Sequence, residues 1–236
     1  LKTSGINTIS AKVGIASSQT WTVAGGGTLT VSGVISDFGS GYSLTKDGTG
    51  DLNLSGVNTY SGATNINAGI LRLDNASSLA GTSGVSISNG ASLFVRSVSP
   101  TLGVSQSLIL NGTGATGTGA LVTSTSGTTT WNGPVSLGSD SLILQGGGTT
   151  LNIGGNVSLG TNTLTVNVAA SNSATISGAI SGSGGLIKTG ASTLILSGAN
   201  TYTGTTAVNS GTLSLAPTGN FLGGVLLVSS ALTLNQ

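Results

Sequence analysis

The chain has 236 residues, of which 37% are hydrophobic and only 5% are charged, and its formal net charge is +1. Intrinsic disorder is excluded, because disordered chains combine low hydrophobicity with high net charge. A nucleic-acid partner is excluded as well, since such a surface needs a basic patch or stripe.

Several reactive residue types are missing from the sequence. Cysteine, histidine and glutamate are absent, so disulfides and thiolate metal sites are excluded. No apolar run reaches the ~18 residues of a membrane-spanning helix, and we expect no membrane insertion of this segment. Leu1 begins within a strand-like pattern and no signal peptide is visible, so we interpret the chain as an excised or processed piece of a longer protein.

Short runs with an aliphatic residue at every second position recur along the chain, which is the period of a β-strand. Helix formers are scarce and β-branched residues abundant, so the sequence predicts an all-β protein. Clusters of Gly, Asn, Asp or Ser separate the runs. In chain order, the predicted strands include residues 1–9, 19–23, 28–31, 86–88, 92–95, 107–110, 120–122, 141–144, 150–153, 156–159, 163–166 and 226–234.

Two segments of the chain are copies of one another. Residues 44–73 read LTKDGTGDLNLSGVNTYSGATNINAGILRL, and residues 186–215 read LIKTGASTLILSGANTYTGTTAVNSGTLSL. The similarity extends N-terminally with a small length difference, which gives copies at about 32–73 and 177–215. The shared repeat positions are Lys46, Leu52, Leu54, Gly56, Asn58, Tyr60, Gly62 and Gly69 in the first copy, and Lys188, Leu194, Leu196, Gly198, Asn200, Tyr202, Gly204 and Gly211 in the second.

Short strands with frequent turns fit a sandwich, a barrel or a solenoid. The repeats favour the solenoid, because a unit that stacks on its neighbour buries the same positions in every copy. We therefore predict a right-handed parallel β-helix, a single segment over residues 1–236. With about 20–25 residues a coil it has roughly ten coils and a length of about 50 Å.

The two copies resemble the passenger-associated transport repeat, also called the autotransporter-associated β-strand repeat. Its usual form is G-x-L-x-K-x-G-x-G-x-L-x-L-x-G-x-N-T-Y-x-G-x-T-x-V-x-x-G-x-L. The second copy departs from the G-x-G element at Gly190-Ala191-Ser192, and Asn65-Ile66 replaces part of T-x-V in the first. The resemblance implies an autotransporter passenger β-helix, located outside the cell or on the surface of a Gram-negative-type bacterium.

Residues that could carry chemistry are few, and we expect no catalytic, metal or cofactor site. The closest carboxylate pair is Asp47 and Asp51, four residues apart, but the second copy has Thr189 and Thr193 there. We interpret the pair as exposed turn or strand carboxylates. The stretch Gly112–Gly117 satisfies G-x-G-x-x-G, yet a strand follows it, so it is predicted to be a turn and not a phosphate site.

The repeated polar residues have two interpretations each. Lys46 and Lys188 could form a binding stripe, but we favour outward-facing residues whose charge discourages sheet association. Tyr60 and Tyr202 could stack on sugars, but we favour rings packed over the neighbouring coil with hydroxyls in water. Asn58 and Asn200 are assigned to turns, where side-chain amides could form a ladder.

Three functions remain open at this stage. The first is a structural module, a stalk, fibre or filament subunit that stacks head to tail. The second is an adhesin that binds glycans or neighbouring cells through a Thr/Ser/Asn face, with self-association end to end or side by side. The third is a glycan-cleaving enzyme, which would need a cluster of carboxylates. With so few charges, stability is expected to depend little on pH.

Overall fold

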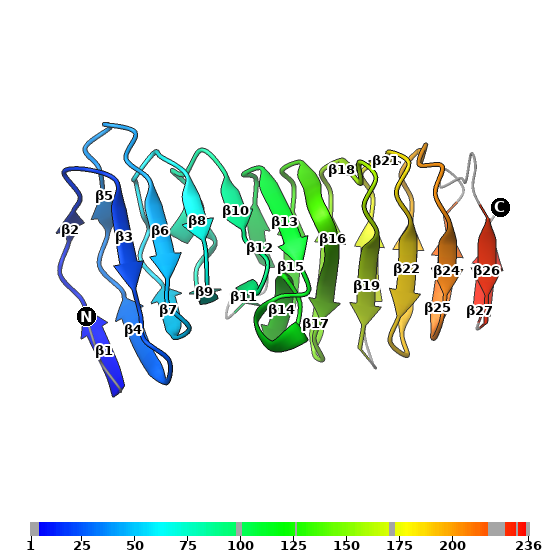
Figure 1. Ribbon diagram of the computed structural model, residues 1–236, viewed down its shortest axis with the longest axis horizontal. Coiled ribbons are helices and arrows are strands. Elements are labelled where there is room, and N and C mark those ends of the chain that lie inside the picture. Colours follow the sequence, from blue (N-terminus) through cyan, green and yellow to red (C-terminus); the bar gives the residue numbers. More distant parts are fainter. Residues whose placement is uncertain are drawn as a thin grey trace.

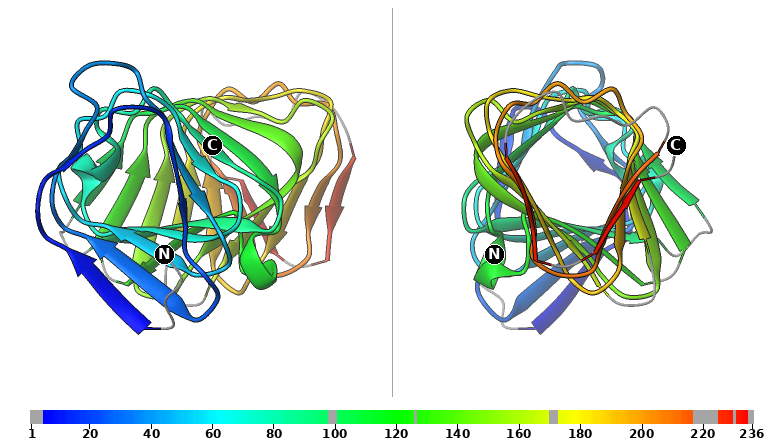
Figure 2. Two further views of the ribbon diagram at one scale, coloured as in Figure 1. Left: turned by 60° about the vertical axis from the view of Figure 1, so that its left-hand side comes forward. Right: turned by 90° about the vertical axis from the view of Figure 1, so that its right-hand side faces the viewer.

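The chain winds into a parallel β-solenoid, as predicted. A computed structural model describes residues 5–97, 101–125, 127–169, 173–216, 225–229 and 231–234. Every strand pairing within these residues is parallel. Figure 1 shows the coils stacked along one rod, and Figure 2 shows the tube-like cross-section.

Three faces, here called A, B and C, run along the rod, and each coil crosses them in that order. Face A consists of β1 (Gly5–Ile9), β4 (Gly27–Val31), β7 (Asp51–Leu54), β9 (Gly69–Leu73), β11 (Ala91–Ser97), β14 (Leu121–Thr125), the second half of β16 (Val135–Gln145), β19 (Leu164–Val168), β22 (Leu186–Thr189), β24 (Thr206–Val208) and β26 (Leu226–Val228).

The other two faces complete the coils. Face B consists of β2 (Val13–Gly14), β5 (Ile35–Ser36), the 3-10 helix η1 (Ala76–Leu79), β12 (Thr101–Val104), β15 (Gly127–Trp131), β17 (Thr149–Ile153), β20 (Ser173–Ile176), β23 (Thr193–Leu196), β25 (Thr212–Leu215) and β27 (Ala231–Leu234). Face C consists of β3 (Gln19–Thr22), β6 (Leu44–Asp47), β8 (Thr64–Ile66), β10 (Val85–Ile87), β13 (Leu108–Gly112), the first half of β16, β18 (Val157–Ser158) and β21 (Ile180–Ser181).

The core is a set of aliphatic columns inside the tube. Alternate residues of each strand point inward, and the parallel register places each one over its counterpart in the next coil. One column on face A runs through Leu29, Leu52, Leu71, Leu93 and Leu121. All five side chains are buried, and full burial of a leucine contributes roughly 1.5–3 kcal/mol.

Glycines at the corner after the face-B and face-A strands allow the coils to approach closely. A Cβ atom on Gly56 would overlap the carbonyl oxygen of Gly33 one coil earlier, and one on Gly198 would overlap that of Gly178. The same overlap would occur between Gly178 and Gly155. The Ser-Gly element of the repeat is therefore required by backbone contact between coils.

The two repeat copies lie on different faces. Lys46 belongs to β6 on face C, whereas Lys188 belongs to β22 on face A. The rotation arises because the coils differ in length. A short coil places Leu186 opposite Thr206, whereas the longest coil places Leu93 opposite Leu121. The motif therefore cannot supply one continuous stripe along the rod.

The longest coil contains the glycine-rich stretch after β13. The residues of this stretch end β13 and then form a single 3-10 turn, η2 (Ala115–Gly117), in which Thr116 has a φ of 55°. The structure places a turn here, as the sequence predicts, and the strand β14 follows it. In the described part of the chain, no helix has the length and apolar character needed to cross a membrane.

Substitution of a corner glycine tests the close approach. Gly198→Ala is expected to lower the free energy of unfolding by about 1–3 kcal/mol, because the new methyl group must displace the backbone of the coil below. Gly147→Ala is the matched control, since nothing lies within 4 Å of a Cβ there. Urea unfolding followed by circular dichroism measures both, and equal stability of the two variants would contradict the proposed contact.

Candidate functional site: buried repeat residues and outer faces

Lys46 and Lys188 are buried inside the tube, so the prediction of outward-facing lysines is wrong. Their exposed fractions are 1% and 0%. The ammonium of Lys46 donates to the carbonyl oxygens of Asp47 (2.9 Å), Gly48 (2.6 Å) and Ala68 (3.0 Å). An ammonium has three donors, and three carbonyls of two successive turns accept all of them.

The second copy repeats this arrangement on its own face. The ammonium of Lys188 donates to the carbonyl oxygens of Thr189 (2.6 Å), Gly190 (2.8 Å) and Ser210 (3.2 Å). Each lysine thus holds the turn that follows its strand and ties it to the turn one coil later. The motif's Lys and Gly positions form a structural unit inside the coil.

Both lysines interrupt an otherwise apolar column. Lys46 stands in register between Trp21 and Ile66, and Lys188 stands between Val166 and Val208. Burial lowers the pKa of each lysine to about 8; near Lys46 the charges of Asp47 and Asp51 oppose the shift. The protonated form is retained at neutral pH because the carbonyls replace water as acceptors.

The two repeat tyrosines are also fully inside. Their rings lie in the core, and the prediction that their hydroxyls lie in water is wrong. The hydroxyl of Tyr60 lies 2.7 Å from Thr64 Oγ1, and that of Tyr202 lies 2.7 Å from Thr206 Oγ1. Burial raises the pKa of both tyrosines to about 12. Neither ring is available to stack on a sugar.

Asn58 and Asn200 bond to backbone rather than to one another's amides. The Oδ1 of Asn58 accepts from the N–H of Ile35 (2.9 Å), and its Nδ2 donates to the carbonyl of Ser78 (2.9 Å). The Oδ1 of Asn200 accepts from the N–H of Ile180 (3.0 Å). At each corner the asparagine side chain makes the hydrogen bonds to neighbouring coils that a strand backbone would otherwise make. These side chains therefore do not form the expected amide ladder.

The remaining repeat positions also lie within the coil structure. Leu52, Leu54, Leu194 and Leu196 are buried core residues. A Cβ on any of the other glycines would overlap the backbone of the preceding coil. These glycines are Gly62, Gly69, Gly204 and Gly211.

Sequence reasoning missed a neutral counterpart of the lysines. Gln145 is fully buried and stands six residues before Leu151, the same spacing as from Lys46 to Leu52. Its Nε2 donates to the carbonyls of Gly146 (2.6 Å) and Thr149. A polar side chain thus holds the following turn here as well, without a charge.

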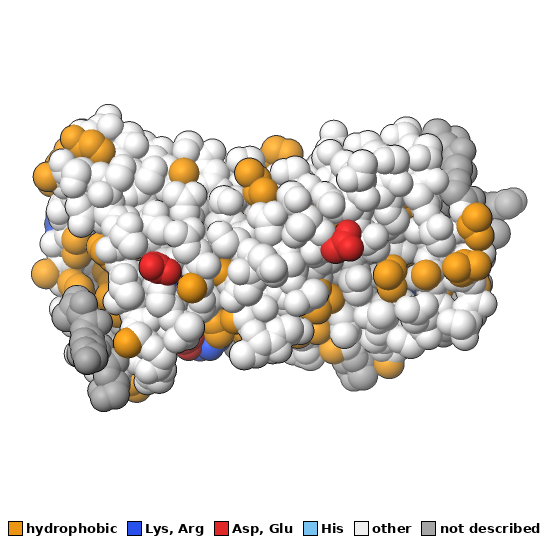
Figure 3. All heavy atoms as spheres, in the orientation of Figure 1, with side chains coloured by type: hydrophobic (Ala, Val, Ile, Leu, Met, Phe, Trp, Pro, Cys, Tyr) orange, Lys and Arg blue, Asp and Glu red, His pale blue; other side chains and the backbone are white. Residues whose placement is uncertain are grey.

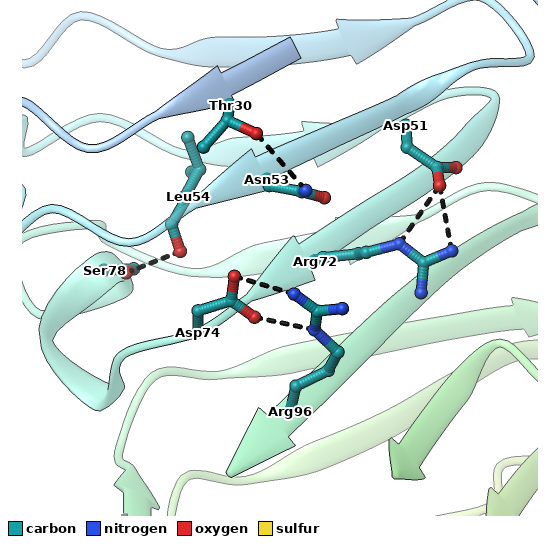
Figure 4. Close-up of polar contacts among 8 residues, drawn as sticks. All are labelled: Thr30, Asp51, Asn53, Leu54, Arg72, Asp74, Ser78 and Arg96. Atoms are coloured by element: carbon teal, nitrogen blue, oxygen red, sulfur yellow. Dashed lines mark hydrogen bonds and ion pairs between the residues drawn. The ribbon is translucent and has the colours of Figure 1, made fainter. Parts of the chain in front are cut away.

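Asp51 does not form an acid–base pair with Asp47. It accepts from the guanidinium of Arg72 one coil later, at 2.9 Å, and Asp74 pairs with Arg96 in the same way at 2.7 Å. Arg72 also lies over the ring of Phe94, 4.7 Å from its centroid. Figure 4 shows both pairs on the outside of face A. Among the described residues, no three side chains of metal-binding type gather.

Asp37 holds a loop that the sequence pattern did not identify. Its carboxylate accepts from the N–H groups of Gly39, Gly41, Tyr42 and Ser61, and from the hydroxyl of Ser61, all within 2.8–3.0 Å. The backbone hydrogen bond from Ser61 contributes most to holding the pKa of Asp37 far below its usual range. The loop at 37–42 is thereby fixed to the following coil.

A row of uncharged polar side chains runs along the outside of face C. One outward residue per coil stands over the next, and all but one carry a hydroxyl or amide. We call this row the face-C ladder; it consists of Thr20, Thr45, Asn65, Ser86, Ile109, Ser136, Ser158 and Ser181. Figure 3, which views the rod from the side of β3 to β16, shows few charged or apolar groups there.

A shallow groove of about 400 Å³ lies beside the far end of this ladder. Hydroxyls line it together with glycine backbone and two apolar side chains. The lining residues are Thr161, Thr163, Ser183, Gly184, Gly185, Ile187, Gly204, Thr205 and Ala207. The exposed chemistry at both places suits hydrogen bonding to uncharged groups.

Comparison with known proteins identifies the repeat and one relative. The model of the passenger-associated-transport-repeat matches residues 44–73 and 186–215. The chain is similar to the adhesin BmaC autotransporter of Brucella suis biovar 1 (strain 1330), with 35% identity over 187 residues. That alignment covers 79% of this chain but only 4% of the length of the relative. No solved structure matches the chain.

The chain therefore carries two passenger-associated transport repeats in a parallel β-solenoid. That relative is an adhesin. The resemblance predicted from Lys46, Lys188 and their neighbours is confirmed. The lysine, leucine, asparagine and tyrosine side chains that carry it are buried, so any function exposed to other molecules depends on different side chains.

Contrary to the weak pH dependence expected from the low charge content, the buried lysines and tyrosines predict a bell-shaped dependence of stability on alkaline pH. Between the folded lysine pKa of about 8 and the unfolded value near 10.5, the unfolded chain binds more protons, so stability rises with pH. Above about pH 10 the folded tyrosines hold protons that the unfolded chain loses, so stability falls.

Urea midpoints measured from pH 7 to 11 check this prediction. The double variant Lys46→Met/Lys188→Met should lose the rise between pH 8 and 10, whereas Lys12→Met, at an exposed position, should retain it. A rise that persists unchanged in the double variant would refute the assignment to the buried ammonium groups.

Proposed function

We propose that this chain is a segment of the surface-exposed passenger of an autotransporter adhesin of a Gram-negative bacterium, and that the face-C ladder is its adhesive side. The observation that supports this most directly is the regular row of outward hydroxyls and amides over seven of eight successive coils. The similarity to an autotransporter adhesin supports the same assignment.

The spacing of the ladder suits many weak contacts made together. Strands of successive coils lie about 4.8 Å apart, so the row presents a polar group at that interval. A single exposed hydroxyl contributes little, but a rigid array adds its contacts without further ordering of the rod. Binding would then depend on the length of the row rather than on one residue.

The chemistry of the ladder also allows it to bind a second copy of the chain. Hydroxyl and amide groups both donate and accept hydrogen bonds, so two such rows can pair when they face one another. A two-fold arrangement of that kind is self-complementary and closes as a side-by-side dimer. The net charge of +1 offers little repulsion between copies. Contact between passengers on opposite cells is the proposed mode of adhesion.

The ladder is tested by adding charge to it. Beads coated with the purified chain should aggregate, and the triple variant Thr45→Lys/Ser86→Lys/Ser136→Lys should reduce aggregation at least tenfold, because like charges would face one another in the pair. The matched control, Thr130→Lys/Asn152→Lys/Thr175→Lys, places the same charges at half-buried outward positions of face B.

Sedimentation and electron microscopy separate the possible arrangements. Side-by-side dimers that disappear only in the face-C variant would support the proposal. Equal loss in both variants would show a general charge effect and contradict it. Filaments one β-helix wide that form in both variants would instead favour head-to-tail stacking of a fibre subunit.

A further inference from the structure

The loop at 37–42, between β5 and β6, is an addition to the coil and not a requirement of it. In the first copy Leu44 comes eight residues after Ser36, whereas in the second copy Leu186 comes only five residues after Ser181. In both copies the strands on either side of this position still pair with strands of the preceding coil. The longer loop therefore serves some purpose other than closing the coil.

This loop is built to be rigid. The five hydrogen bonds accepted by Asp37 come from both the loop itself and the next coil, through Ser61. The N–H of Ser40 also donates to the carbonyl of Asp37 at 3.1 Å. Hydrogen bonds to a charged carboxylate are among the stronger ones in proteins. A loop fixed in this way presents its outermost side chain in one position.

That side chain is Phe38, which is 80% exposed. Its φ of 56° lies in the left-handed region, where a bulky residue is a real outlier and the backbone is strained. Ring atoms Cε2 and Cζ lie so close to Gly14 that a Cβ there would be 2.9 Å away. One part of the ring thus rests on a glycine of the preceding coil, while most of it faces solvent.

Neither folding nor solubility accounts for this arrangement. The strained backbone and the exposed apolar ring both oppose stability, and the Asp37 contacts maintain them. Rigid, exposed aromatic rings are the usual anchors of binding surfaces, because they offer a large contact area with little loss of entropy. We propose that Phe38 is the anchor of a carbohydrate-binding site that takes an uncharged pyranose ring.

The surroundings favour a neutral sugar over a charged or apolar ligand. The Asp37 carboxylate is fully occupied, and the polar groups that bond to the loop backbone are the hydroxyls of Ser36 and Ser61. The loop sequence Ser36–Ser43 contains no other exposed large apolar side chain, so an apolar partner would find only one ring. The C–H groups of a pyranose can contact the electron-rich ring face while one of its hydroxyls accepts from the hydroxyl of Ser36, since the Ser61 hydroxyl donates to Asp37.

This inference rests on the proposed adhesive function and names a ligand class for it, but at a site separate from the face-C ladder. A glycan array probed with the labelled chain tests it. Wild type should bind neutral glycans, and Phe38→Ser should reduce that signal at least tenfold. Val57→Ser, which removes another exposed apolar side chain (52% exposed), is the matched control and should bind like wild type.

A second variant tests the role of the rigid loop. Asp37→Asn keeps the ring but replaces one acceptor oxygen by an amide that would face N–H donors, so binding should fall several-fold. Circular dichroism should show that Phe38→Ser and Val57→Ser retain the wild-type melting temperature within a few degrees.

The outcomes separate this site from the ladder. Glycan signal that survives in the face-C variant but not in Phe38→Ser would support the inference, whatever the bead assay shows. Signal retained in Phe38→Ser, lost equally in Val57→Ser, absent for all neutral glycans, or restricted to acidic glycans would overturn it. Failure of bead aggregation with an intact glycan signal would refute only the ladder proposal.

Discussion

Parallel stacking of the coils is the constraint on which the rest of the structure depends. Each residue stands about 4.8 Å from its counterpart in the next coil, so an inward position must suit the residues above and below it. Leucine columns satisfy this by packing, and the corner glycines satisfy it by lacking a side chain. The turns are harder to accommodate, because their carbonyls point into an interior without water.

The buried lysines solve the problem of the turns. An ammonium on a flexible stem reaches carbonyls of two successive turns, and the apolar stem continues the column of the strand. The amide of Gln145 likewise donates hydrogen bonds to carbonyls of the turn that follows its strand. Because Lys46 and Lys188 do this on different faces, the repeat is a property of one strand–turn–strand unit and does not depend on its place around the tube.

The sequence was sufficient to predict the fold, the repeat and a strand instead of a helix after the glycine-rich stretch. The period of a strand and the spacing of a repeat are local patterns that can be read along the chain. It misled at Lys46, although Leu44 two residues earlier already places that position on the inner side. The charge of the side chain suggests an outward position, whereas the alternation of the strand places it inside. The Asp37 loop could not be predicted, because its donors come from Ser61 in the next coil.

Function is separated from the repeat for the same physical reason. Inward and corner positions are fixed by contact with neighbouring coils, so outward positions such as Thr45 and Ser86 are free to carry recognition. Insertions are tolerated only at corners, where a loop can leave the tube without disturbing the ladders, and the Asp37 loop is of this kind. The rod therefore supplies length and spacing, while the recognition proposed for this chain depends on what stands outside it: a regular polar row on face C and one strained aromatic residue at a corner.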